Sequence, residues 1–268
     1  MITKNQLDFL LRNLFRKREN TMKIAFILTH SGLTYSHLKK ASTLTRKNPY
    51  HNFGHALAVT EYVIKLAIAA GCTKAEINLL AFATLNHDDG HSGMFHWYDE
   101  MRSAKIMRKN TTPCDTQVIG KNHAKILDKM EVLIIATTFN RRGKSRSKLG
   151  KIIQDADLAN IGQGIYYWLW SSMGLIDEFK NEKRYRNLTS KIFIYQIQEE
   201  FVNYLATVSK TGKVYLSDSA QKIFHDPLKD IKKLMKLPYS AIKYAYRVRK
   251  KDITLNEFTL RIKELVKK

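Results

Sequence analysis

The chain has 268 residues, 44% of them hydrophobic, with four prolines and twelve glycines. This length allows one large or two small domains with a sizeable core, and the composition is that of a globular, helix-rich protein. Two cysteines, Cys72 and Cys114, are too few for a disulfide framework or a thiolate metal cage. No apolar run approaches the roughly 20 residues of a transmembrane helix. We therefore expect a cytoplasmic protein in a reducing compartment.

The formal net charge is +22, from 46 lysines and arginines against 24 aspartates and glutamates. A surplus of this size predicts attraction to anions, whether phosphorylated small molecules, nucleic acid or an acidic membrane surface. The alternative is that lysines only solvate exposed faces, because the basic residues are spread along the whole chain. Charge alone leaves the partner open.

Helices make up most of the predicted elements. Apolar residues at helical spacing predict an amphipathic helix over residues 5–17. A helix over residues 51–70 ends at Gly71, and Thr73 caps the next one. Further helices are predicted over residues 74–87, 99–110, 116–139, 152–160, 165–182 and 191–208, followed by two or three shorter ones in a basic tail.

Strand signals are scarce, so we predict an all-α protein. Residues 1–40 are expected to form a helical extension that packs on the core. Residues 41–225 form the core that carries the motifs, and residues 226–268 form a basic helical extension. A basic loop over residues 141–151 either attracts phosphates near the site or is simply solvated.

Three motifs rich in histidine and aspartate stand out: YHNFGHA from Tyr50, NHDDGH from Asn86 and QDADLAN from Gln154. In the first, two histidines four residues apart place both imidazoles on one helix face, and the second motif repeats that spacing. Five of the nine histidines lie between His51 and His96. The set therefore predicts a metal site.

Nitrogen and oxygen donors without thiolates suit zinc, manganese, iron or magnesium. Asp88 is a carboxylate beside His87 and is the natural bridge between two metals. Two metals about 3.5–4 Å apart would clamp the attacking and leaving oxygens of a displacement at phosphorus and would acidify a shared water. Asp155 and Asp157 lie about 200° apart on a helix, so only one of them is expected to face the site.

These motifs resemble the metal-binding signatures of the His-Asp (HD) domain superfamily, in the form found in class I 3′,5′-cyclic-nucleotide phosphodiesterases. The resemblance runs from about residue 50 to residue 201, with the pieces in the family's order. The interval between the second and third motifs is short, as in compact bacterial HD phosphohydrolases. The resemblance implies an HD-domain, phosphodiesterase-like helical bundle with two divalent metal ions.

The resemblance also implies a role for each motif residue. Asp88 would bridge to a second metal completed mostly by water, and His51 would be the general acid that protonates the leaving sugar oxygen. His91 would lie near the bridging hydroxide, and Glu100 would fix a ligating imidazole, unless it is only a solvated acid. The first metal would be held by His55, His87, Asp88 and Asp157.

A purine pocket is implied further along the chain. The family holds its base with a glutamine and a phenylalanine three residues later, a pattern that Gln198 and Phe201 match, and Asn160 matches an asparagine that touches the base. The pattern is also common in amphipathic helices, and Gln196 is an alternative on another face. The chain departs from the family at four positions, which puts the substrate in doubt: Ala58, Ser92, His96 and Gln154.

The favoured interpretation is a metal-dependent phosphohydrolase that converts a 3′,5′-cyclic nucleotide to the 5′-monophosphate. An HD nucleotide phosphatase or pyrophosphohydrolase, including one acting on alarmones, is a second reading. Nuclease activity is a third, favoured by the net charge and disfavoured by an enclosed site. A module that binds nucleic acid or membrane and keeps a vestigial metal site is a fourth. The oligomeric state stays open.

Overall fold

The structure is a computed structural model, which describes residues 18–45, 48–93, 96, 98–209, 211–248 and 255–267. The helix predicted over residues 5–17 lies outside this part of the chain. All regular elements in the described ranges are helical, so the all-α prediction is confirmed. None of the described helices is both long and apolar enough to cross a membrane.

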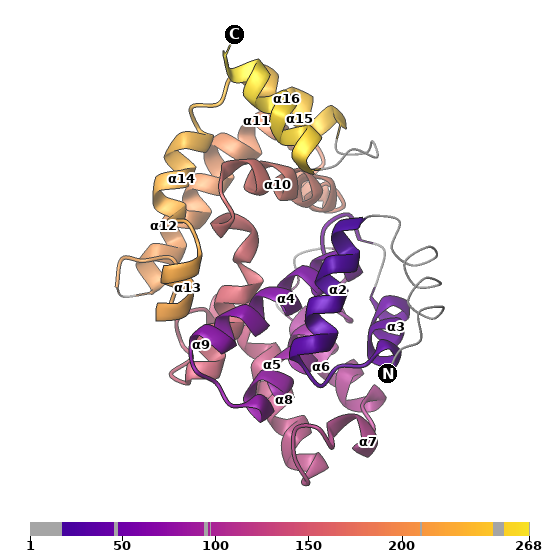
Figure 1. The fold of residues 1–268 in the computed structure, drawn as a ribbon. Helices are drawn as coiled ribbons and strands as arrows, with labels where there is room; N and C mark the ends of the chain where they lie inside the picture. Colours follow the sequence, from indigo (N-terminus) through magenta and orange to yellow (C-terminus); the bar gives the residue numbers. More distant parts are fainter. Residues whose placement is uncertain are drawn as a thin grey trace.

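The N-terminal half of the described chain packs around α5 (Lys74–Leu85), in which every side chain from Ile77 to Leu85 is buried. Helices α4 and α8 pack against α5, and α9 packs against α4, α5 and α8. These helices form the lower half of Figure 1. The remaining bounds in this half are α2 (Arg18–His30), α3 (Tyr35–Leu44), α4 (Phe53–Ala69), α6 (Asp99–Asn110), α7 (Pro113–Thr116), α8 (His123–Ala136), η1 (Phe139–Arg141) and α9 (Lys148–Asp157).

The C-terminal half is organised around α10 (Ile165–Phe179), which carries the aromatic segment of the sequence. Figure 1 shows this half above the first, with α10 facing it. Helices α14, α15 and α16 all pack against α10. The other elements are η2 (Ala159–Gly162), η3 (Lys183–Tyr185), α11 (Ser190–Ile192), the π-helical turn η4 (Phe193–Ile197), α12 (Gln198–Val208), α13 (Asp218–Ile223), α14 (Pro227–Leu234), α15 (Tyr239–Val248) and α16 (Leu255–Lys267).

Capping residues set the helix bounds nearest the motifs. The Asn52 side chain accepts hydrogen bonds from the backbone N–H groups of Gly54 and His55, so α4 begins at Phe53. The prediction that His51 lies within this helix is therefore wrong by two residues. Thr73 and Glu76 form a capping box at the start of α5, as the sequence indicates for Thr73.

Two other predicted helices differ from the structure. The helix predicted over residues 116–139 is interrupted, because α7 ends at Thr116 and Asn122 caps a new helix that begins at His123. The helix predicted over residues 191–208 exists but includes the π-turn η4 directly before Gln198. Such turns are frequently found at functional sites.

The three-part division of the chain stays a prediction. Helix α2, from the predicted N-terminal extension, packs on α4. The basic tail folds into α14, α15 and α16, which cover α10. Both ends of the described chain therefore lie against helices that carry or support the motifs.

Candidate metal centre and active site

The three motifs converge at the junction of the two halves. His55 lies in the first turn of α4, His87 and Asp88 lie in the turn after α5, and Asp157 is the last residue of α9. Asp88 Oδ2 is 3.5 Å from His55 Nε2 and 3.2 Å from His87 Nε2. Asp157 Oδ1 is likewise 3.5 Å and 3.2 Å from the same two nitrogens. Each carboxylate thus lies within 3.5 Å of both imidazole nitrogens, and His55, His87 and Asp157 form one group that could hold a metal ion.

These separations fit a shared cation. Two ligands that each lie about 2.1 Å from one metal, at angles of 90–110°, are about 3.0–3.4 Å apart. Among the described residues, His55 Nε2 and Asp88 Oδ2 are buried without a hydrogen bond. Buried polar atoms without partners are costly, and a divalent cation would satisfy both. The donor set therefore fits a divalent metal such as zinc, manganese, iron or magnesium.

His87 is oriented by its second nitrogen. The imidazole Nδ1 is 2.6 Å from the backbone oxygen of Thr84, so Nδ1 carries the proton and Nε2 faces the two carboxylates. Burial opposes protonation of His87, but the charges of Asp88 and Asp157 outweigh it and raise its pKa to about 10. A proton thus holds this position when no cation does.

The pKa values of the two carboxylates, Asp88 and Asp157, are lowered, in contrast to that of His87. Burial alone would raise the pKa of Asp157, but the close contacts and the charges of His55 and His87 hold that pKa well below its usual range. The pKa of Asp88 is likewise lowered, chiefly by His87 against the effect of burial. Ionised carboxylates are the form that binds a metal.

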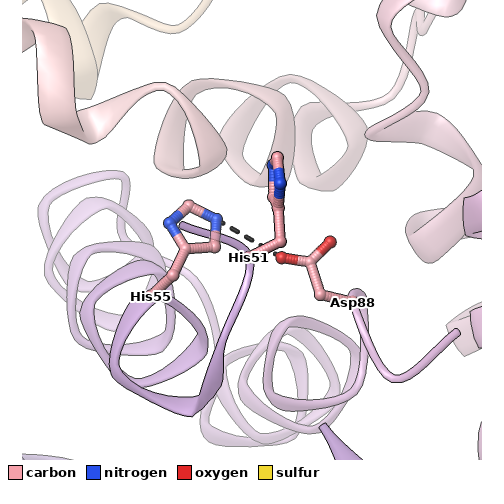
Figure 2. A group of neighbouring side chains, drawn as sticks. All are labelled: His51, His55 and Asp88. Atoms are coloured by element: carbon pink, nitrogen blue, oxygen red, sulfur yellow. Dashed lines mark ion pairs between the residues drawn. The ribbon is translucent and has the colours of Figure 1, made fainter. Parts of the chain in front are cut away.

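His51 lies beside this cluster and is held by an acid on α10. Its Nδ1 is 2.5 Å from Glu178 Oε1, while Glu178 Oε2 accepts hydrogen bonds from the backbone N–H groups of Tyr50 and His51. Burial lowers the pKa of His51, but Asp88 and Glu178 raise it further, to about 9. Figure 2 shows His51 with His55 and Asp88, and the dashed ion pair between the latter two. His51 is therefore protonated at neutral pH.

His91 stacks on His51 with ring centroids 3.8 Å apart and 20° between the planes. Its Nδ1 accepts a hydrogen bond from the backbone N–H of Gly93. Burial and the charge of His51 lower the pKa of His91 to about 4, so this ring is neutral beside a protonated one.

Glu100 lines the same pocket on the first turn of α6. Burial raises its pKa to about 7, and the charges of Asp88 and Asp157 act in the same direction. For His87, the imidazole is fixed by the Thr84 carbonyl and not by Glu100. Glu100 therefore lies where the sequence predicts, and its role toward a ligating imidazole stays a prediction.

The metal-facing side chains line one side of a pocket of about 410 Å³ that the predicted base-binding residues also line. Gln198 is buried, and its Oε1 accepts a 2.6 Å hydrogen bond from the indole N–H of Trp168. Phe201 stacks on Phe139, with ring centroids 5.6 Å apart. Gln196 is exposed and does not line the pocket. The structure thus places Gln198 and Phe201 in the pocket and leaves their alternative outside.

Asn160 lies in η2, immediately after the helix that ends in Asp157. It lines the pocket, and its Nδ2 is 3.4 Å from the Ser171 hydroxyl oxygen on α10. The amide oxygen of Asn160 is thereby left for a ligand to reach. The pocket is lined by all ten residues to which the family resemblance gives a role: His51, His55, His87, Asp88, His91, Glu100, Asp157, Asn160, Gln198 and Phe201.

The choice between Asp155 and Asp157 is settled by geometry. Asp157 faces the two imidazoles, whereas Asp155 faces away and is fully buried against residues 214–217. Arg142 belongs to the basic loop that was predicted either to attract phosphates near the site or to be solvated. It is buried, lines the pocket and pairs with Asp155 at 3.0 Å. Solvation is therefore the wrong prediction for this arginine.

Comparison with solved structures identifies the fold of this chain, whereas comparison with protein families and curated proteins finds no match. The phosphodiesterase domain of Salpingoeca rosetta rhodopsin phosphodiesterase is similar in structure, with a TM-score of 0.63 and 15% sequence identity over 90% of this chain and 95% of that chain. A second structure, the phosphodiesterase domain of the RhoPDE fusion protein from the same choanoflagellate, gives 0.57 and 15% over 91% and 92%. The chain has the fold of a phosphodiesterase domain.

The structure adds three residues to the site that the sequence analysis did not assign: Tyr50 and Phe139 line the pocket, and Glu178 contacts His51. Glu178 carried a weak signal, because an acid in an apolar, aromatic helix needs a buried partner. Tyr50 stands inside the first motif, and its ring lies 4.6 Å from that of His55. Phe139 carried no signal, because its position opposite Phe201 depends on the packing of two distant segments.

Proposed function

We propose that the chain is a metal-dependent phosphodiesterase that hydrolyses a 3′,5′-cyclic nucleotide to the 5′-monophosphate. One observation carries the proposal. A carboxylate oxygen of Asp88 and one of Asp157 each lie 3.2–3.5 Å from the Nε2 atoms of His55 and His87, which are separations expected between ligands of one metal. The four side chains line a pocket of about 410 Å³, within the range of small-ligand sites.

His55, His87, Asp88 and Asp157 would hold the divalent cations, whose chemistry would be to lower the pKa of a water and to neutralise charge at the phosphate. The lowered pKa of Asp157 keeps its carboxylate ionised, the form that binds a metal. The raised pKa of His87 means that this imidazole carries a proton in the absence of metal and must lose it when a metal binds. The four side chains come from three separate segments, so the folded chain is needed to assemble them.

His51 is the proposed general acid. Glu178 holds Nδ1, which leaves Nε2 as the nitrogen that donates a proton to the leaving sugar oxygen. The raised pKa keeps that proton in place near neutral pH. His91 lies flat against this ring as a neutral partner, so it adds no second positive charge beside the acid.

Substrate binding is proposed for Gln198, Phe201 and Asn160. The indole of Trp168 occupies the carbonyl oxygen of Gln198, so its amide N–H₂ group can donate to an acceptor on the edge of a base. The rings of Phe201 and Phe139 offer apolar faces for stacking. Asn160 can accept from an exocyclic amine through its amide oxygen.

Several of the alternatives place different demands on the same residues. A vestigial metal site would leave buried donors without partners, which costs stability and gives nothing in return. An HD phosphatase or pyrophosphohydrolase would use the same four ligands on a linear nucleotide, so it is distinguished by substrate and not by the metal. We also propose that the protein is cytoplasmic and that its substrate is a phosphorylated small molecule.

The test is hydrolysis of cyclic AMP and cyclic GMP with added Mn²⁺ or Mg²⁺, comparing wild type with Asp88→Ala. We expect turnover by wild type that requires metal and is lost in the variant. Hydrolysis of linear nucleotides or alarmones alone would replace the cyclic substrate and retain the metal site. A folded wild-type protein that neither binds metal nor hydrolyses any of these would overturn the proposal.

A further inference from the structure

Asp155, which points away from the metal cluster, is the centre of a second buried ionic network, and one member of this network, Arg142, also lines the pocket. The network consists of Arg142, Asp155, Leu216 and Ser217, which we call the Asp155 clasp. Asp155 is fully buried, yet its carboxylate contacts four donors. It accepts from the backbone N–H of Leu216 at 2.9 Å, from the N–H and hydroxyl of Ser217 at 2.7 Å each, and from Arg142 Nη2 at 3.0 Å.

Arg142 extends this network to the end of α9. Its Nη1 donates to the backbone oxygen of Gln154 at 2.7 Å, and Nη2 donates to that of Val214 at 2.7 Å. The Gln154 carbonyl belongs to the last turn of α9, where carbonyls have no partner within the helix. The guanidinium therefore caps the helix that ends in Asp157.

The clasp also joins α9 to a short helix. Ser217 is the N-cap of α13 and accepts from the backbone N–H of Ala220 while its hydroxyl donates to Asp155. Helix α13 packs against both α4 and α9, and it lies beside α9 in Figure 1. These two helices present His55 and Asp157 to the cluster, so α13 connects the supports of two proposed ligands.

The position of Asp155 on α9 allows the clasp to fix the rotation of this helix about its axis. Residues two apart on an α-helix are separated by about 200°, so a side chain fixed on one face determines the rotation of the other. Gln154 adds a further tether, because its Nε2 donates to the backbone oxygens of Ala136 and Arg141. The last turn of α9 is thus held from several directions while Asp157 points to the imidazoles of His55 and His87.

We propose that the Asp155 clasp is a positioning device that sets the rotation of the last turn of α9 and thereby aims the Asp157 carboxylate at the metal. This inference rests on the proposed function, because it assigns Asp157 to a metal. It adds Arg142, Asp155 and Ser217 as residues that act through the ligand without touching it. The segment over residues 214–217, far along the chain from the motifs, becomes part of the site.

The first test is Mn²⁺ affinity, measured by calorimetry on the metal-free full chain, for Asp155→Asn. The variant preserves shape but turns an N–H₂ group or a neutral oxygen toward donors, which breaks the clasp. We expect Mn²⁺ to bind at least ten-fold more weakly than in wild type. The matched control is Asp230→Asn, a buried aspartate on α14 whose ion-pair partners are His225 and Lys233 and not residues of the clasp. It should keep the wild-type affinity within two-fold even where it lowers the melting temperature.

Charge loss must be separated from positioning, since Asp155→Asn leaves Arg142 unbalanced. The double variant Arg142→Gln with Asp155→Asn removes both charges, and it should still bind Mn²⁺ about ten-fold more weakly. The neutral change Ser217→Ala should weaken binding about three-fold, and Ser217→Thr, which keeps the hydroxyl, should restore it. These milder variants carry the test if Asp155→Asn does not fold.

A spectroscopic readout reports on ligand geometry without catalysis. With Co²⁺ in place of Mn²⁺, the visible absorption band should change in Asp155→Asn and stay as in wild type in Asp230→Asn. Wild-type affinity and spectrum in a folded Asp155→Asn variant, or recovery of wild-type affinity in the double variant, would overturn the positioning role while leaving the proposed function intact. Failure of wild type itself to bind metal would overturn both.

Discussion

The two ends of the pocket are built on opposite principles. At the metal end, atoms such as His55 Nε2 and Asp88 Oδ2 are buried without hydrogen bonds among the described residues. At the end proposed to bind the base, which we call the base end, the polar side chains already have hydrogen-bond partners, since Gln198 accepts from Trp168 and Asn160 donates to Ser171. The first end has buried donor atoms that need a cation, and the second end has amides whose orientation is set by hydrogen bonds to neighbouring side chains. Loss of a residue should therefore abolish function at the first end and only weaken binding at the second.

The largest effect is expected for substitution of Asp88, the carboxylate proposed to bind both metals. Asp88→Ala should lower kcat by at least about 10³-fold, because it removes several kcal/mol of metal-dependent stabilisation of the transition state. Asp89→Asn is the matched control, since Asp89 is equally buried but bonds to Thr45. Initial rates with saturating Mn²⁺ would measure both. Similar losses in the two variants would show that Asp88 has no special role.

The general acid should give the next largest effect. His51→Gln is expected to lower kcat by about 10²-fold, the lower end of general acid–base contributions. In wild type, the acid must be protonated, so activity should fall as pH rises past the pKa of His51. Glu178 raises that pKa, so Glu178→Gln should shift the alkaline limb of the rate profile to lower pH. An alkaline limb that stays in place would rule out His51 as the group it reports.

How far each end could be predicted from sequence follows from the same contrast. The paired histidines and aspartates of the motifs predict a metal site, and the resemblance to the HD superfamily selects His55, His87, Asp88 and Asp157 as its ligands. The fold brings these residues from three segments to one place. Gln198 and Phe201 could be proposed only by pattern, because a glutamine and a phenylalanine three apart also suit an ordinary helix. The structure adds what spacing cannot contain: the indole that turns Gln198, the ring opposite Phe201 and the acid that holds His51.

Helix bounds were missed for related reasons. The sequence predicts helical segments correctly over residues 99–110, where acidic and basic residues lie at the expected ends. It misses the interruption before His123, because the cap at Asn122 resembles any polar residue within a helix. The sequence does not predict the clasp around Asp155, since two of its partners, Leu216 and Ser217, lie 61 and 62 residues further along the chain.

Competition between metal and proton at His87 gives a third prediction. The pKa of His87 in the metal-free protein is about 10, above the usual 6.5, so its protonated form contributes stability that is fully present below about pH 6.5 and is lost as pH rises through about 10. With EDTA, the melting temperature should therefore fall between pH 7 and pH 10. The metal needs the neutral ring, so Mn²⁺ affinity should rise by about ten-fold per pH unit for one displaced proton over that range.

Calorimetry in buffers of different ionisation enthalpy would count the protons released. A pH-independent affinity would contradict the assignment of His87 as a ligand. His123, the first residue of α8, is bonded to Thr116 and does not line the pocket. It offers a control, because His123→Gln should leave the pH dependence of Mn²⁺ binding unchanged.

The smallest expected effect lies at the base end. Gln198→Ala should raise KM by about three- to ten-fold with little change in kcat, because it removes a hydrogen bond worth about 0.5–1.5 kcal/mol to the base and not to the reacting atoms. Gln196→Ala is the matched control on the same helical stretch, and its exposed side chain should leave both constants unchanged. Steady-state kinetics on the two variants would sharpen the contrast between the ends of the pocket. A fall in kcat as large as that of His51→Gln would break it, since Gln198 would then act on the chemistry itself.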